Sequence, residues 1–352
     1  MIAALVGSAW LLNSALAQDS DLVGIEKTAL GAQELAIIVN TADPQSIRVA
    51  EYYKKIRRIP NKNLIRVQFT PDISVMSQLE FQRIKAMIDA ATPAQVQSYA
   101  LTWTKPYRAG CMSITTAFAA GFDPAFCSEP CSPTKPNPYF NSPSRRPYDD
   151  HGLRPAMMLA GKSFKEVKKL IDRGVASDAT FPRGAAYLVS TSDKSRNIRA
   201  GFYPEIMQQL KGGPADLRMV KADYIEKKSR VLFYFTGAKQ VNALNTIRFL
   251  PGAIGDHLTS AGGQLTSSGD QMSSLRWLEA GATGSYGAVV EPCNFPAKFP
   301  HPGIVIDRYT RGETLIESYW KSVAWPGEGI FIGEPLAAPY AVRPSTIMTN
   351  SQ

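Results

Sequence analysis

Short, unbroken runs of apolar residues that alternate with helix-length amphipathic segments constrain this chain more than any other feature of its sequence. Residues 35–39 (LAIIV) and 231–235 (VLFYF) are apolar throughout, as strands of a parallel sheet are when both of its faces are covered. Between such runs lie helical segments, and Ser163 with Glu166 has capping-box spacing at the start of one of them. The alternation predicts an α/β fold: a mainly parallel sheet with helices on both faces.

The predicted elements cover most of the chain. We predict strands at residues 35–39, 64–69, 99–104, 157–159, 186–190, 217–220, 231–235, 247–254, 286–290 and 330–332. We predict helices that follow Asp43-Pro44 and Ser163, and further helices at residues 78–91, 198–210, 272–279 and 314–323. Residues 105–153 interrupt the pattern, because they are rich in Pro, Ser, Asn and Cys and lack periodicity. So long an irregular segment is usually functional or cross-linked, and we expect it to be an excursion over one edge or end of the sheet.

The N-terminus has the pattern of an export signal. An apolar run at residues 2–12 ends before Ala15-Leu16-Ala17, an A-x-A cleavage signal, so we predict a signal peptide at residues 1–17. A buried N-terminal helix is the alternative, and the lack of Lys or Arg before the run leaves open a start upstream of Met1. We expect residues 18–352 to form a single α/β domain, periplasmic or secreted, with no transmembrane segment in the mature chain.

The cysteines predict cross-links. An even number of cysteines, Cys111, Cys127, Cys131 and Cys293, indicates two disulfides after export to an oxidising compartment. The most economical pairing is Cys127–Cys131 with Cys111–Cys293, and the next is Cys111–Cys127 with Cys131–Cys293. No His follows with zinc spacing, so no metal is expected.

Charge and glycine spacing limit the ligands that can be considered. The net charge is +9, and short basic clusters such as Lys227-Lys228 indicate a solvated surface or attraction to an acidic envelope polymer. No aromatic stacking platform lies beside these clusters, so nucleic acid is not expected. Gly281, Gly284 and Gly287 do not fit the dinucleotide-binding spacing, and we predict no cofactor.

A group of polar residues follows one predicted strand and is our candidate catalytic site. Residues 255–260 (GDHLTS) come directly after the strand at 247–254, and open sheets bind ligands at the carboxyl ends of their strands. Carboxylate, imidazole and hydroxyl groups are the components of base-activated nucleophilic catalysis, so Asp256, His257 and Ser260 are the predicted catalytic residues. Adjacency in sequence does not by itself bring these groups together, because neighbours on a strand point to opposite faces. The alternative is a polar turn whose side chains bond local backbone.

Four further residues are predicted to bind ligand. Thr259 belongs to the same segment, and Arg108 follows a strand, where it could clamp a carboxylate or phosphate or form a structural ion pair. Glu291 is expected to be an acid buried at a strand end. His301 lies between prolines on a rigid loop, as a partner of Glu291 or as a surface residue.

Six long segments of the chain carry a resemblance to known proteins: LAIIVNTADPQSIRVAEYYKKIRRIP, LTWTKPYRAGC, RPAMMLAGKSFKEVKKLIDRGVASD, GAIGDHLTSAGG, GATGSYGAVVEPCNFPAKFPHP and GETLIESYWKSVAWPGEGIFIGEP. They resemble an uncharacterised family of exported bacterial proteins, found in genomes that carry exosortase, the sorting enzyme for proteins with PEP-CTERM tails. This chain ends in STIMTNSQ and has no such tail, so the resemblance does not imply that it is an exosortase substrate.

A fainter resemblance is to gingipain-type cysteine peptidases, which implies a caspase-like three-layer sandwich. Aligned by pattern, Thr236-Gly237 stands at the catalytic His-Gly position and Gly255-Asp256 near the catalytic Cys position, so both catalytic residues are absent. Two hypotheses follow. The first is an exported hydrolase-like protein that acts on an envelope or extracellular polymer or peptide. The second is a non-catalytic binding or protein-sorting accessory module on the same scaffold.

Overall fold

The computed structural model describes residues 29–127, 131–266 and 269–342, so the predicted signal peptide at residues 1–17 lies outside the described residues. Its main strands are β1 (Leu35–Asn40), β2 (Leu64–Val67), β4 (Ser98–Leu101), β7 (Ala156–Met158), β8 (Ala185–Ser190), β9 (Asp216–Lys221), β10 (Val231–Gly237), β11 (Phe249–Leu258), β12 (Gly284–Ala288) and β13 (Gly329–Gly333). The helices are α1 (Pro44–Arg57), α2 (Gln78–Ala91), α3 (Ile114–Ala120), α4 (Pro147–His151), α5 (Phe164–Ser177), α6 (Tyr203–Gln209), α7 (Leu275–Ala280), α8 (Pro302–Thr310) and α9 (Leu315–Trp320). Within these described ranges, none of the helices is both long and apolar enough to cross a bilayer.

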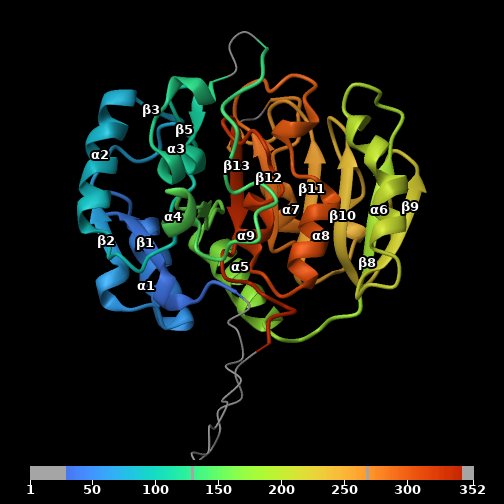
Figure 1. Cartoon of the computed structure of the whole chain (residues 1–352), viewed down its shortest axis with the longest axis horizontal. Coiled ribbons are helices and arrows are strands. Elements are labelled where there is room, and N and C mark those ends of the chain that lie inside the picture. The colour runs from blue at the N-terminus through green and yellow to red at the C-terminus, as the bar shows by residue number, and fades with distance from the viewer. Residues whose placement is uncertain (1–28, 128–130, 267–268, 343–352) are drawn as a thin grey trace, which may run out of the picture.

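The main strands pair into one sheet in the order β2-β1-β4-β7-β13-β12-β11-β10-β8-β9, with β13 and β12 at its centre (Figure 1). The first five strands in this order are parallel to one another, and so are the last five. The two blocks meet in an antiparallel pairing of β12 with β13 that runs from Gly284–Gly333 to Ala288–Gly329. The two blocks therefore run in opposite directions, so the carboxyl ends of the strands in one block lie on the same side of the sheet as the amino ends of the strands in the other block.

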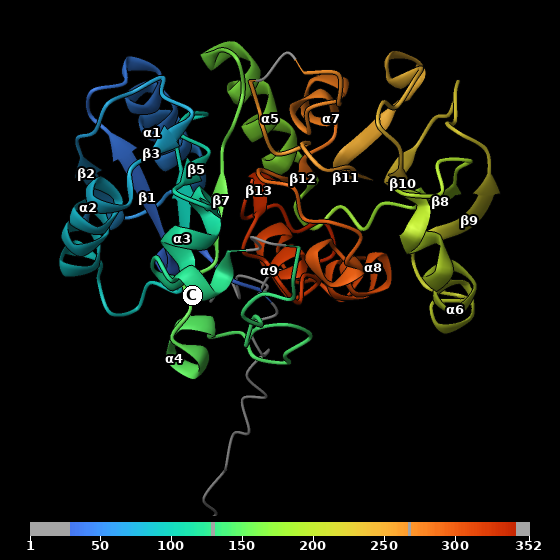
Figure 2. The same ribbon diagram turned by 90° about the horizontal axis from the view of Figure 1, so that it is seen from above.

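Helices cover both faces of the sheet (Figure 2). Alternate residues of β10 show this directly, because Phe233 contacts Tyr309 of α8, at 6.1 Å between ring centroids, while Tyr234 contacts Trp277 of α7 at 4.9 Å. In the other block, Ile37 packs in the cluster that includes α1, and Ile38 packs in the cluster that includes α2. The predicted α/β class with a mainly parallel sheet is confirmed, and the three layers are consistent with a caspase-like sandwich.

The segment at residues 105–153 contains more regular structure than its composition predicted. Two short strands, β5 (Arg108–Ala109) and β6 (Met112–Ser113), join β3 (Val75–Met76) in a small second sheet, and helices α3 and α4 follow. The segment packs against the end of α9, because the Asn137 side-chain amide donates to the carbonyl oxygens of Trp320 and Val323 at 2.8 and 2.9 Å.

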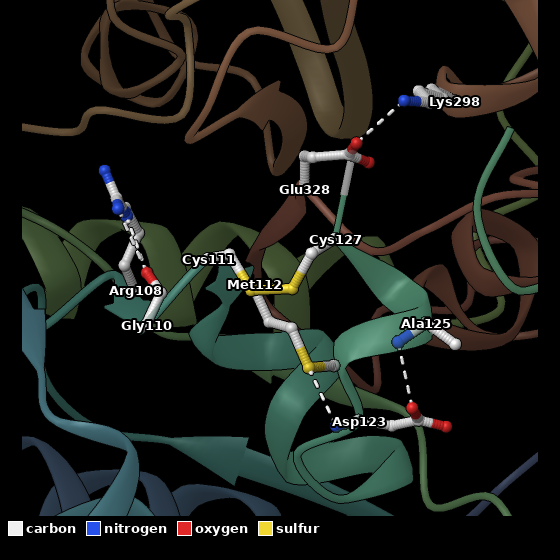
Figure 3. The surroundings of a disulfide bond; sticks show 9 residues. All are labelled: Arg108, Gly110, Cys111, Met112, Asp123, Ala125, Cys127, Lys298 and Glu328. Atoms are coloured by element: carbon white, nitrogen blue, oxygen red, sulfur yellow. Dashed lines mark hydrogen bonds and ion pairs between the residues drawn. A yellow bond between two sulfur atoms is a disulfide. The ribbon is translucent and has the colours of Figure 1, made fainter. Parts of the chain in front are cut away.

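Both predicted cross-links are present, but our first choice of pairing was wrong. Cys111 bonds Cys127, with Cα atoms 5.6 Å apart, and Cys131 bonds Cys293, with Cα atoms 5.8 Å apart (Figure 3 shows the first). Helix α3 lies between Cys111 and Cys127 and folds the chain back, so these two side chains meet. The second bond ties the excursion to the segment that follows β12.

Single substitutions distinguish the two pairings. In Cys293→Ala, the thiol that becomes free should be Cys131, and in Cys127→Ala it should be Cys111. Alkylation of each unfolded, unreduced variant, with tandem mass spectrometry to locate the label, measures this. A label on Cys111 in Cys293→Ala would contradict the structure.

Candidate functional site

The polar segment that we expected beyond a strand end lies largely within a strand. Strand β11 continues to Leu258, four residues beyond the end predicted from the sequence, so Asp256 and His257 are consecutive core residues. In the parallel register Asp256 lies beside Phe235 and His257 beside Thr236. Because successive strand residues point to opposite faces, the carboxylate and the imidazole are separated by the sheet.

Asp256 forms a buried ion pair. Its Oδ1 lies 2.6 Å from Nη1 of Arg199, and both side chains are almost completely inaccessible. Arg199 also donates to the carbonyl oxygens of Thr236 and Pro300, at 2.7 and 3.2 Å. Burial raises the pKa of Asp256, and the guanidinium opposes this effect. The pair therefore joins the 3₁₀ turn η4 (Asn197–Phe202) and the residue before His301 to the sheet.

His257 lies on the opposite face, where both of its ring nitrogens are engaged. Nδ1 accepts a hydrogen bond from the indole N–H of Trp277 at 2.9 Å, and Nε2 lies 2.9 Å from the carbonyl oxygen of Met272. A ring that accepts at Nδ1 and donates at Nε2 is the neutral tautomer. Burial of the ring lowers the pKa of His257 to about 4.

These contacts do not form the catalytic relay that we expected from Asp256, His257 and Ser260. Ser260 is half-buried beyond the end of β11, but neither nitrogen of His257 is available to take its proton. Asp256 faces the other side of the sheet, where Arg199 holds it. The hypothesis treated these residues as a turn, whereas the strand continues through the first two of them.

Thr259 belongs to a hydrogen-bonded network that closes the end of β11. Its hydroxyl donates to Oε1 of Gln271 at 2.6 Å and accepts from Nε of Arg196 at 3.0 Å. Gln271 Oε1 also accepts from the backbone N–H of Ala261, and Arg196 pairs with Asp193 at 3.0 Å. A ligand-binding role for Thr259 stays a prediction.

The other predicted binding residues lie apart from this network. Arg108 donates twice to the carbonyl oxygen of Gly110, within its own turn. Glu291 is exposed, not buried as expected, and its Oε1 accepts from the backbone N–H of Cys293. His301 is the N-cap of α8 and accepts from the N–H of Ile304, so the expected rigid loop is the start of a helix. Across the described residues, no three His, Cys, Asp or Glu side chains gather as a metal ion requires.

One large hollow in the described structure was not predicted from the sequence. It has a volume of about 980 Å³ and lies at the amino ends of β8, β9 and β10. We call it the basic groove and define it by its charged lining residues, five cations and one acid: Arg183, Arg218, Lys227, Lys228, Arg230 and Asp216. The Lys227-Lys228 pair was the sequence signal for it, but the arginines come from separate segments.

The chain matches no known protein-family profile, and no curated protein matches it. A solved structure described as "Structure of Protease" is similar over 90% of this chain and 81% of its own length, with 12% sequence identity and a TM-score of 0.43. Similarity at this level assigns no activity to this chain.

The buried imidazole predicts a specific dependence on pH. Unfolded His257 takes a proton near its ordinary pKa of about 6.5, whereas folded His257 does so only near pH 4. The folded protein should therefore lose up to roughly 3 kcal/mol of stability between pH 6.5 and 4 through this group. In His257→Gln, which keeps a donor and an acceptor, urea unfolding should show this loss removed. An equal loss in both proteins would contradict the assignment.

The buried ion pair predicts that removing one of its charges costs more stability than removing both. Arg199→Met should destabilise the protein by about 3–5 kcal/mol, because it leaves the Asp256 carboxylate buried without its cation. Adding Asp256→Asn should recover part of this loss, because no charge then remains in the pair. Urea unfolding of the parent, the single variant and the double variant measures the effect. A single variant as stable as the parent would show that the pair does not hold η4 to the sheet.

Proposed function

We propose that this protein is a non-catalytic binding module that holds an acidic polymer of the cell envelope or the extracellular medium in the basic groove. The observation that carries the proposal is the composition of the groove, with five cations and one acid around a hollow of about 980 Å³. A groove lined by charges of one sign raises the local concentration of a ligand of the opposite sign.

Most of these cations are free to meet a ligand. Two of the five are engaged: Arg218 pairs with Asp216 at 2.5 Å and donates to the hydroxyl of Tyr187, and Arg230 donates to the carbonyl oxygen of Arg183 at 2.7 Å. Arg183, Lys227 and Lys228 are exposed, and they form no ion pair with any residue that the structure describes. Each exposed charge contributes little alone, so a polymer that meets several at once is the ligand that this lining favours.

The end of β11 supports binding over hydrolysis. A general base must lie within hydrogen-bond reach of the proton that it takes, and the nitrogens of His257 are held by Trp277 and Met272. The hydrolase hypothesis therefore lacks the base that we had assigned to it.

An exported location is part of the proposal. The two disulfides are typical of proteins in oxidising compartments. The predicted signal peptide and the sequence resemblance to exported proteins of exosortase-carrying bacteria fit the same location. The proposal takes residues 18–352 as one binding domain.

Removing charge from the groove should weaken binding. We expect the triple variant Arg183→Ala, Lys227→Asn and Lys228→Ala to bind polygalacturonate and polyphosphate about tenfold or more weakly at low salt, with a shallower dependence on salt. Asn is chosen because Lys227 has a left-handed backbone conformation, with φ of 50°. Calorimetric titration at several salt concentrations measures both quantities.

A matched control separates the groove from net charge. Lys55→Ala, Lys62→Ala and Lys165→Ala remove the same charge from exposed positions outside the groove. This control should bind both polymers as the parent does. Equal weakening in the two triple variants, or no binding of either polymer to the parent, would contradict the proposed function.

A further inference from the structure

We infer that the polymer in the basic groove is an acidic polysaccharide, one of whose pyranose rings stacks on Phe181 while its carboxylates meet the surrounding cations. This inference rests on the proposed function and names its ligand class. Phe181 is the residue that supports it, because an aromatic side chain that stays exposed gains no stability from burial in the core.

Phe181 lines the groove with an unusually exposed side chain. Its exposed fraction is 54%, whereas the other aromatic residues of the lining, Tyr187 and Tyr340, are exposed by only 3% and 5%. A large exposed apolar side chain within a charged hollow is a feature of ligand sites, where a few polar groups surround an apolar contact.

The backbone presents this ring in a conformation that bulky residues rarely adopt. Phe181 has φ of 46°, in the left-handed region that glycine and asparagine favour. Its N–H donates to the carbonyl oxygen of Pro339 at 2.9 Å, and its ring lies nearly perpendicular to that of Tyr340, with the centroids 6.1 Å apart. The Tyr340 hydroxyl in turn donates to the carbonyl oxygen of Pro182. These contacts hold the aromatic ring at the rim of the groove before any ligand binds.

Two other residues of the lining share this conformation. Lys227 and Arg230 have φ of 50° and 54°, and both are exposed cations. Left-handed non-glycine residues cluster at functional sites, where the surrounding structure holds them. Phe181, Lys227 and Arg230 therefore all have a left-handed backbone conformation that their residue types rarely adopt, and all three line the same groove.

The arrangement of aromatic and charged groups favours a sugar polymer. Polyphosphate offers charge but no ring to stack. Single-stranded nucleic acid needs successive aromatic platforms along a basic groove, but here Phe181 is exposed while Tyr187 and Tyr340 are covered. An acidic polysaccharide needs one aromatic surface for the apolar face of a ring and cations for its carboxylates, and the groove has both.

A second hollow extends the path beyond one sugar unit. It has a volume of about 250 Å³, shares residues 213–215 and Thr310 with the basic groove, and adds Lys211, Arg311 and Asp307, of which the last two pair with each other at 2.7 Å. A ligand that passes from one hollow into the other meets one further exposed cation, Lys211, so oligosaccharides long enough to reach both should bind more tightly than short ones.

The test compares ligands with and without rings on the full exported chain. Phe181→Ala should weaken the binding of oligogalacturonate by roughly 3- to 10-fold, the range of one aromatic contact. It should leave the binding of polyphosphate unchanged. The matched control is Phe140→Ala, which removes another exposed aromatic ring, 39% exposed, in the excursion; it should change neither affinity.

The possible results separate stacking on Phe181 from binding in the basic groove. Polyphosphate and oligogalacturonate binding with no difference between the parent and Phe181→Ala would overturn the ring-stacking inference and leave the proposed function standing. Failure of the parent to bind either ligand would overturn the proposed function itself. Single-stranded DNA that binds more tightly than oligogalacturonate of equal charge at the same salt would overturn the polysaccharide class.

Discussion

The antiparallel pairing of β12 with β13 is the contact on which the rest of the sheet depends. It joins two parallel blocks of strands that run in opposite directions, with partners from Gly284–Gly333 to Ala288–Gly329. The approach is close, because a Cβ atom at Gly329 would collide with the hydroxyl of Tyr286 on the partner strand. Since the blocks are reversed, carboxyl ends of strands do not all meet at one edge. Each edge of the sheet therefore has strand ends from one block and strand starts from the other.

Buried charges hold β13 at both of its ends. Glu328, the residue before the strand, pairs with Lys298 at 2.8 Å, and both side chains are 1% exposed. Glu334, the residue after the strand, pairs with Arg57 of α1, which also pairs with Asp178. Buried ion pairs add little net stability, but a misplaced strand would leave each charge without its partner. We infer that these pairs select the register of β13, and hence the reversal of the two blocks.

The sequence predicted the scaffold better than the site, for physical reasons. Helix α2 was predicted at its observed bounds, residues 78–91, because the apolar spacing of a helix is a local signal. Strand β11 was cut short because residues 255–257 look like a turn, whereas the burial of Asp256 depends on Arg199, far away in the chain. Helix α8 was missed because its prolines suggested a loop, although Pro302 at its first turn is favourable. The basic groove was missed because its charged residues come from three separated segments and no short pattern describes such a surface.

We propose that a polyanion binds where β8, β9 and β10 begin, and not at the end of β11. Hydrogen–deuterium exchange of the full chain, with and without saturating polygalacturonate, tests this most directly. We expect slower exchange in residues 181–184, 212–216 and 227–230, which line the groove. Residues 259–263 and 271–272, around Thr259 and Gln271, should exchange unchanged. Protection confined to these last two segments, with the groove unaffected, would contradict polyanion binding in the basic groove.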